Sequence, residues 1–504
     1  MAGVGEEYVT RLVGYQLSTF NSSPVTPNLP QRIAIIGQAN TANQGTLDTD
    51  PYQITSAAKA GQRYGYGSPV HSVARILFPV GGGGVGAIPV WVYPQAAAGG
   101  ATAKVVEIEP TGVATGNGTH TVVIAGRKGV DAQFYNITIN EGDTTDDITA
   151  KIEDAVNAVL GAPVAASSDD YVATLTTKWA DATSDELSVS VDTGDNDFGI
   201  TYDITTTQSG AGVPSIATAL TAMGPVWNTI LVNTYGTNTT IMDALQAWNG
   251  IPDAENPTGR FAPTVMKPLI ALTGSTVEDP SSITDSRKNE VTIAICPAPL
   301  SAGFPYEAAA NACVLFARKS QDTPELDISG SFYPDMPTPT EIGDMSELAN
   351  RDTIVKKGCS TVDLSVGKYK VMDFVTTYHK DGENPPQFRW CRDLMLDFNI
   401  AFGYNLMVEV NVVDHVIAND NDVVTALKVI KPKQFKQLIN SLIETFVSKG
   451  LLVDAAFTRE SIAVSISTVN PNRFNVFFRY KRSGTAHIVS TVAEAGFNFG
   501  TLTV

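Results

Sequence analysis

Five short runs of branched apolar residues, separated by longer segments with helical periodicity, constrain the fold of this chain more than any other feature. Such runs are typical of strands buried on both faces, as in a parallel sheet covered by helices. Because strands and helices alternate, the pattern predicts an α/β core with a partly parallel sheet. The five runs are Arg32–Gly37, Ile88–Tyr93, Thr229–Val232, Pro268–Leu272 and Val291–Cys296.

Residues 96–210 depart from this pattern. Their strand candidates are rich in Thr and Val and are separated by Gly, Asp and Asn, which predicts a β-rich domain inserted into the core. One amphipathic helix is predicted over residues 146–160. The segment holds 18 acidic and 5 basic side chains, so it carries −13 of the formal net charge of −18. We expect this insert to be exposed, because repulsion between like charges is weaker in water.

The last third of the chain predicts an α+β domain. A strand is expected over residues 368–378, and helices are expected over residues 385–407, starting at a proline pair, and over residues 432–448. A hairpin is expected between residues 461 and 480, with its turn at residues 470–472.

Opposite charges separate within this last third. Residues 371–422 hold 3 basic and 9 acidic side chains, whereas residues 423–504 hold 10 basic and 4 acidic ones. The two halves could pair between copies of the chain, or folding could mix both signs on one surface, and the sequence leaves both open. A basic contact patch is predicted in the second half. Its members are Lys431, Lys433, Lys436, Arg479, Lys481 and Arg482.

Both ends of the chain are predicted to be extended apolar arms. The N-terminal arm joins the core through a proline-rich tether over residues 21–30, and the C-terminal arm is interrupted by glycine. A strand on a tether cannot bury itself locally, so each arm needs a sheet edge, in its own domain or in a neighbour. The arm residues expected at inter-subunit contacts are Val9, Val13, Tyr15, Leu17, Ile488, Val489, Val492, Phe497 and Phe499.

The expected organisation is therefore an α/β core split by the insert and followed by the α+β domain, with an arm at each end. In chain order the parts are the N-terminal arm and linker (1–30), the first part of the core (31–95), the acidic β-rich insert (96–210), the second part of the core (211–367), the C-terminal α+β domain (368–486) and the C-terminal arm (487–504).

The sequence contains no motif that indicates enzyme chemistry. Gly81, Gly83 and Gly86 match the spacing of a dinucleotide-binding loop, but such a site needs the order strand, glycines, helix, and here the order is reversed. The Asp-rich turn at residues 192–197 could bind Ca²⁺ weakly, yet it lacks the bidentate glutamate and is expected to be solvated. None of the five histidines lies in a recognisable nucleophile context. We therefore predict no catalytic residue, cofactor or metal site.

Composition argues against several further classes. A net charge of −18 disfavours nucleic-acid binding, and no apolar run approaches the roughly 18–20 residues needed to cross a bilayer. The N-terminus lacks the basic and apolar regions of a signal peptide. The cysteines show no metal-binding spacing, so we expect reduced, buried thiols. These are Cys296, Cys313, Cys359 and Cys391.

Several segments of the core and of the last third form a recognisable set. They are Ile33-Ala-Ile-Ile-Gly37, Lys368-Tyr-Lys-Val-Met-Asp-Phe-Val, the helices from Gln387 to Met407 and from Pro432 to Ser448, Asn470-Pro-Asn-Arg-Phe-Asn-Val, and Gly496-Phe-Asn-Phe-Gly. This set resembles the tail sheath proteins of contractile-tailed bacteriophages, the Mu-like branch in particular. The resemblance covers about residues 30–95 and 210–500.

The resemblance implies a structural subunit rather than an enzyme. The core would have a subtilisin-like architecture without a catalytic triad. Sheath subunits assemble as stacked rings or a helix around the tail tube in a metastable extended state, and contraction drives the tube through the host envelope. Their terminal arms add strands to neighbouring copies. The implied partners are other copies of the chain and the tail tube, baseplate and tail terminator proteins, in a virion tail assembled in the host bacterial cytoplasm.

Alternatives remain open at this point. An R-type bacteriocin or another contractile injection system would use the same kind of subunit, and only genome neighbourhood would distinguish it from a phage. A cytoplasmic α/β hydrolase would need a histidine paired with a nucleophile, and the sequence indicates none. A tube or baseplate protein is disfavoured by the α/β core with its insert.

Overall fold

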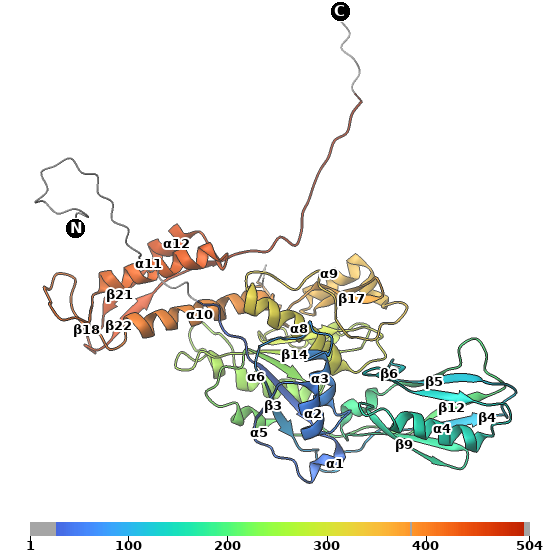
Figure 1. Ribbon diagram of the computed structural model, residues 1–504. Coiled ribbons are helices and arrows are strands. Elements are labelled where there is room, and N and C mark those ends of the chain that lie inside the picture. Colours follow the sequence, from blue (N-terminus) through green and yellow to red (C-terminus); the bar gives the residue numbers. More distant parts are fainter. Residues whose placement is uncertain (1–26, 384–385, 498–504) are drawn as a thin grey trace, which may run out of the picture. The chain divides into compact units, whose positions relative to one another are not determined.

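The computed structural model describes residues 27–383 and 386–497, which form two compact units (Figure 1). Phe402–Lys481, together with residues 27–28, make up the C-terminal unit. Leu29–Ala401, together with the residues from Arg482 onward, make up the sheet unit. The chain therefore enters the C-terminal unit within helix α10 (Cys391–Asn411) and returns to the sheet unit after Lys481.

A six-stranded sheet in the order β15-β14-β13-β1-β3-β2 lies at the centre of the sheet unit. The first five strands in this order pair in parallel, and β2 pairs antiparallel with β3 at one edge. All five predicted runs contribute a strand, so the expected α/β core with a partly parallel sheet is confirmed. The strands are β1 (Ile33–Gln38), β2 (Tyr52–Ile54), β3 (Val90–Gln95), β13 (Ile230–Asn233), β14 (Ile270–Ser275) and β15 (Ile293–Pro297).

Helix α8 (Pro305–Asp322) packs closely on this sheet and is buried along most of its length. A Cβ added to Gly274 of β14 would lie 1.6 Å from the carbonyl oxygen of Pro305, so only glycine allows this approach. Helix α3 (Pro69–Leu77) contacts both α8 and β1. The unit also contains α1 (Thr41–Gln44), α2 (Ala57–Tyr64), α5 (Ala217–Ala222), α6 (Thr239–Asn249), α7 (Ser281–Asp285), α9 (Leu348–Lys356), and the hairpin of β16 (Thr361–Ser365) and β17 (Lys368–Asp373).

The insert forms antiparallel sheets around one helix, as its Thr- and Val-rich strand candidates predict. Its helix α4 (Thr145–Asn157) begins with a capping box between Thr144 and Asp147. One sheet has the order β12-β4-β10-β9 and the other β11-β5-β8. Their strands are β4 (Val105–Thr111), β5 (Gly118–Ile124), β8 (Asn136–Ile139), β9 (Val164–Asp169), β10 (Val172–Thr177), β11 (Val189–Asp192) and β12 (Thr201–Gln208), and β6 (Gly129–Val130) pairs with β7 (Gln133–Phe134).

Three strands of the insert lie outside its strand candidates, which are residues 103–109, 120–125, 133–140, 170–177 and 186–191. They are the two-residue β6 and the longer β9 and β12. Strand β12 contains Tyr202 and Ile204 among otherwise polar residues, and β9 is built mainly from Ala, Ser and Asp. Neither carries the apolar alternation that identifies a half-buried strand. Pairing with β4 and β10 supplies their backbone partners instead.

The C-terminal unit packs a hairpin and the end of α10 against helix α11 (Pro432–Ser448), whose predicted bounds are confirmed. The predicted hairpin is also confirmed, as β21 (Ala463–Ile466) and β22 (Phe474–Phe477). The buried cluster comprises Ile430, Phe435, Ile439, Ile443 and Ile462. The other elements are β18 (Val416–Ile417) paired with β19 (Val429–Ile430), α12 (Ala455–Ser461), and β20 (Leu452–Val453) paired with β23 (Lys481–Arg482).

The start expected for α10 at residues 385–386 is wrong for the described residues, because residues 386–390 are not helical. A bridge pairs Trp390 with Val375, and the amide of Thr376 donates to the carbonyl of Arg389 at 2.7 Å. These tertiary contacts hold the segment extended, so the helix begins at Cys391. Residue 385 itself lies outside the described residues.

Buried His71 on α3 makes stability depend on pH. Burial lowers its pKa to about 4, and its Nδ1 accepts a hydrogen bond from the amide of Gly67 at 3.1 Å. Since the unfolded chain binds this proton near pH 6.5, the free energy of unfolding should fall by roughly 3 kcal/mol as pH drops from 6.5 to 4. Denaturant titrations across this range measure the loss. The variant His71→Asn, which keeps an acceptor but cannot titrate, should lack this component, and an unchanged slope would contradict the assignment.

Candidate assembly surfaces

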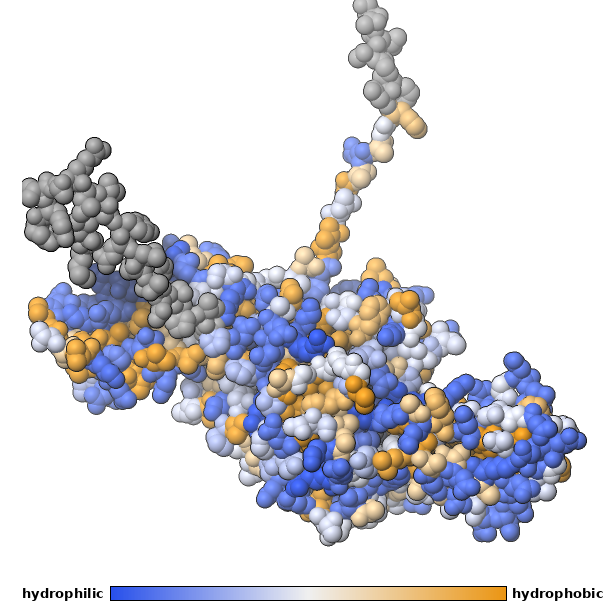
Figure 2. Space-filling model, in the orientation of Figure 1, coloured by the Kyte–Doolittle hydropathy of each residue, from blue (hydrophilic) through white to orange (hydrophobic). Residues whose placement is uncertain are grey.

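The C-terminal arm is extended over residues 488–497 and contains no helix or strand (Figure 1). Its predicted contact residues within this range are between 82% and 90% exposed; they are Ile488, Val489, Val492 and Phe497. Figure 2 shows apolar side chains along this segment. A row of exposed apolar side chains marks an interaction segment. The other predicted arm residues, at positions 9, 13, 15, 17 and 499, lie outside the described residues.

An arginine fixes the point at which the arm begins. Arg482 forms two hydrogen bonds with the carboxylate of Asp397 on α10, at 2.8 and 2.6 Å, and donates a third to the carbonyl of Gln387 at 2.7 Å. The Arg482 and Asp397 side chains are only 25% and 13% exposed. A two-point arginine–carboxylate pair is strong and directional. It therefore fixes the start of the arm against α10 and sets the direction in which the arm extends from there.

Two further contacts extend this anchoring to His487. Buried Arg392 donates to the carbonyl and hydroxyl oxygens of Ser483 at 2.5 and 2.6 Å. The ring of His487 stacks on Trp390 with a centroid distance of 4.3 Å, and its Nε2 lies 3.8 Å from Asp327. Burial raises the pKa of the Asp327 carboxyl. The arm thus has an anchored root, residues 482–487, and an exposed apolar part.

The hairpin β21–β22 provides sheet edges in the C-terminal unit. Among the described strands each pairs only with the other, so both outer edges lack a strand neighbour there. Val476 of β22 packs in the core, whereas Phe477 is 54% exposed and the guanidinium of Arg479 lies 5.6 Å above its ring. An edge of this kind can accept a strand from another chain.

Four of the six predicted patch cations are engaged within their own unit. Lys431 and Lys436 donate to main-chain carbonyl oxygens at 2.5 and 2.9 Å. Lys481 forms an ion pair with Asp454 at 2.6 Å. Arg482 belongs to the root of the arm. These contacts stabilise the subunit itself. The charged groups of the other two patch cations form no such bond to a carbonyl or carboxylate oxygen among the described residues.

Lys433 and Arg479 are those remaining cations. Within residues 27–383 and 386–497, neither forms an ion pair with a carboxylate, and Arg473 does not either. Residues 402–481 hold 9 basic and 7 acidic side chains, although the whole chain carries −18. The C-terminal unit is therefore the electropositive part of an acidic protein, and it fits an acidic partner surface.

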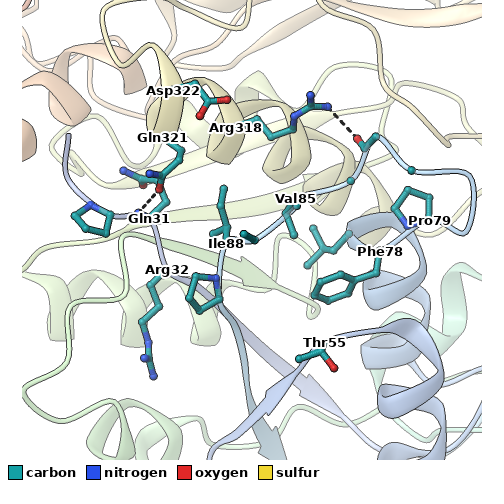
Figure 3. Close-up of a pocket in the computed structure, with 18 of the residues that line it drawn as sticks. Gln31, Arg32, Thr55, Phe78, Pro79, Val85, Ile88, Arg318, Gln321 and Asp322 are labelled. Carbon is teal, nitrogen blue, oxygen red and sulfur yellow. Dashed lines mark hydrogen bonds between the residues drawn. The ribbon is translucent and has the colours of Figure 1, made fainter. Parts of the chain in front are cut away.

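A groove of about 1050 Å³ opens at the amino ends of β1 and β3, where Arg32 and Pro89 line it (Figure 3). The glycine loop over residues 81–86 forms one wall, and Arg318 donates to the carbonyl of Gly83 at 3.1 Å. As predicted, the loop follows helix α3 and precedes β3. Dinucleotides bind at the carboxyl ends of parallel strands, so this loop is no dinucleotide site.

The titratable side chains of residues 27–383 and 386–497 form no group of metal ligands and no evident catalytic pair. No group of three or more His, Cys, Asp or Glu side chains is placed to hold a metal ion in the described part of the chain. Nε2 of His379 lies 3.2 Å from Oδ1 of Asp285, and Nδ1 of His120 lies 2.7 Å from the Tyr202 hydroxyl; neither contact joins a histidine to a serine or a cysteine. The four cysteines are buried, as predicted, and burial raises the pKa of each thiol. None of the described helices is long and apolar enough to span a bilayer.

A known protein matches most of this chain. The Mu-like prophage FluMu tail sheath protein of Haemophilus influenzae is 22% identical over 402 residues, which are 77% of this chain and 78% of that protein. The chain is therefore similar to a Mu-like prophage tail sheath protein over most of its length. The predicted resemblance is confirmed by this match. No protein-family model matches the sequence.

Two solved structures are similar to this chain. The sheath tail protein of Desulfitobacterium hafniense is 11% identical with a TM-score of 0.45, covering 93% of this chain and 100% of its own. The helical sheath of the anti-feeding prophage in its contracted state is 10% identical with a TM-score of 0.42, covering 98% of this chain and 100% of its own. At these scores the relationship to sheath proteins rests on the sequence match.

Replacing Arg482 should release the root of the arm. The native cysteines are buried, so a nitroxide attached to a Gly484→Cys variant reports only on the root. Arg482→Ala removes a two-point ion pair; at a cost of about 1.4 kcal/mol, the ratio of immobile to mobile spin label should fall roughly tenfold. Arg473→Ala, which removes an arginine without an ion pair, is the matched control. Equal immobilisation in both variants would show that Arg482 does not hold the root.

Proposed function

We infer that this chain is the tail sheath subunit of a contractile phage tail or a related injection system. The observation that carries this inference is the match to a prophage tail sheath protein over 77% of the chain. The chain is accordingly a structural protein and not an enzyme. The anchored root and the exposed apolar part of the arm support the same conclusion, because a subunit that polymerises needs segments directed at its neighbours.

We propose that the arms join neighbouring copies of the chain by strand addition. The outer edges of β21 and β22 supply unpaired backbone groups, and the arm supplies an extended apolar strand without a described partner strand. Main-chain hydrogen bonds would give affinity, and alternate side chains would give specificity. Two arms on each subunit would build a continuous mesh, in stacked rings or a helix, rather than a closed dimer.

The remaining features of the proposal follow the sheath family. The sheath would surround the tail tube in a metastable extended state and contract to drive it through the host envelope. Its further partners would be the tube, baseplate and tail terminator proteins, in a virion tail assembled in the host cytoplasm. The core would keep a subtilisin-like architecture without a triad, within the six-part organisation expected from the sequence.

Deleting residues 488–504 should give a soluble subunit that cannot polymerise. The deletion leaves the root and its contacts with α10 in place, so the fold should keep its thermal stability. Sedimentation and negative-stain electron microscopy measure assembly. The full-length triple variant Val489→Ser, Val492→Ser and Phe497→Ser should fail to assemble in the same way, since it loses only apolar contacts.

The control is the double variant Ser490→Ala and Thr491→Ala, which should assemble normally. Normal sheaths from the deletion variant would refute the proposed role.

Charge reversal at Lys433 should weaken assembly without weakening the subunit. Reversing Lys431, Lys433 and Lys436 together tests the whole basic patch, but two of these also bond main-chain carbonyls. The single variant Lys433→Glu avoids that complication. Each exposed pair is worth about 0.2–1 kcal/mol, and the loss repeats at every subunit. The critical concentration for assembly should rise while Tm stays constant; unchanged assembly in the triple variant would remove the patch from the interface.

A further inference from the structure

The order of the strands creates a crevice at the carboxyl ends of β1 and β13. From β1 the chain moves to β3 on one side, and it later returns to β13 on the other side. In open α/β sheets, the carboxyl ends of strands at such a reversal form a crevice in which ligands bind. The insert leaves the sheet just after the carboxyl end of β3, and its residues 178–186 lie at this crevice.

Two hydrogen bonds tie these residues to the carboxyl end of β1. The amide of Thr41 donates to the carbonyl of Lys178 at 2.8 Å. The side chain of Gln38, the last residue of β1, donates to the carbonyl of Ala180 at 2.9 Å. Gln38 is fully buried, so water cannot readily replace this bond. The main chain of the insert is thus hydrogen-bonded directly to the sheet.

Trp179 lies between these two bonds and fills the space beside α8. Its side chain is fully buried, and its ring meets those of Phe304 and Tyr306 edge-on, at centroid distances of 5.2 and 6.3 Å. Both partners lie at the start of α8, which follows β15, the edge strand beside β14. The indole Nε1 contacts Asp181 and Thr183 at 3.2 and 3.3 Å, so its polar atom is also satisfied.

Asp181 gives this segment its compact shape. Its Oδ1 accepts from the amides of Thr183 and Ser184 at 2.6 and 3.1 Å, which caps the short 3₁₀ helix Ala182–Glu186. The cavity left beside this helix measures only about 180 Å³ and is lined by residues that follow β13, such as Tyr235. Ligand pockets are usually about 300–1,000 Å³, so the segment leaves too little room for a typical ligand.

A second attachment holds the insert to the start of α8. Arg127 of the insert forms ion pairs with Glu307 at 3.2 Å and with Asp335 at 2.7 Å. The side chains of Arg127 and Glu307 are 15% and 3% exposed. The hydroxyl of Ser188 also donates to the carbonyl of Ala302 at 2.8 Å. Separating the partners of a buried ion pair strongly destabilises the fold, so these contacts hold the insert against the start of α8.

We propose that residues 178–186 are a plug, which closes the crevice at the carboxyl ends of β1, β13 and β14 and makes the insert and the sheet one cooperative body. The crevice that serves α/β enzymes as a ligand site is here occupied by the chain itself. The insert is then an integral part of the sheet unit and not a removable decoration on it. This holds whether or not the chain is a sheath subunit.

Removing the Trp179 ring tests the plug. In the full-length chain, Trp179→Ala should lower Tm by roughly 5–10 °C and speed amide hydrogen exchange in both the insert and the sheet. Strands β10 and β1 report on the two parts. Millimolar indole should restore both the Tm and the slow exchange, because it refills an apolar cavity of its own shape. Trp179→Phe, a milder change, should show the same joint loosening to a smaller degree if the alanine variant misfolds.

The matched control is Trp248→Ala on α6. Trp248 lies in the same unit but packs on Arg260 at the surface, 4.8 Å from its guanidinium, and contributes nothing to the plug. This variant should leave the exchange of β10 unchanged and should not respond to indole. Faster exchange confined to the insert of Trp179→Ala, with β1 still protected, would overturn the proposal. Joint loosening that indole does not reverse would also count against it.

Discussion

The close approach of α8 to β14 is the constraint on which the sheet unit depends. Gly274 permits it, because any larger residue there would collide with the main chain at Pro305. The start of α8 is thereby held at the carboxyl ends of the strands, where Trp179 and Arg127 of the insert reach it. The last turns of α8 line the groove at the opposite ends of the strands. One tightly packed helix thus runs from the carboxyl ends of the strands to their amino ends.

Charge is distributed so that the acidic insert and the C-terminal unit differ in sign. The insert carries −13, and its like charges repel less in solvent than they would in an interior. The C-terminal unit keeps a small excess of cations, among which Lys433 and Arg479 have no ion pair in the described residues. An assembly of many copies can use such complementarity to select register, because each exposed pair is weak and only their sum matters.

The anchored root changes the energetics of arm docking. A wholly free segment would lose all of its conformational entropy on binding to a neighbour. Arg482, Arg392 and His487 have already ordered the first residues of the arm, and only the part beyond His487 remains to be ordered. Anchoring also limits the volume that the apolar part can search, which in the proposed assembly would raise its effective concentration near a neighbouring subunit.

Local patterns in the sequence predicted the parts of the fold that depend on local physics. The five branched apolar runs, helix α11 and the hairpin β21–β22 were predicted because burial imposes a period on the side chains of each element. The extended course of residues 488–497 was predicted because an apolar segment at a chain end has no local place to be buried. Strands β9 and β12 carry no such period, and their pairing partners define them instead.

The remaining features were decided by the tertiary structure, because they join residues far apart in the sequence. The root of the arm depends on Arg482 meeting Asp397, 85 positions away, and the plug depends on Gln38 meeting Ala180, 142 positions away. No period in the sequence encodes such pairs. The sequence by itself determined the core strands, helix α11 and the hairpin β21–β22, because burial sets the period of their side chains. The packing of α8 on the sheet decided which distant side chains come together, since only a closed core fixes those distances.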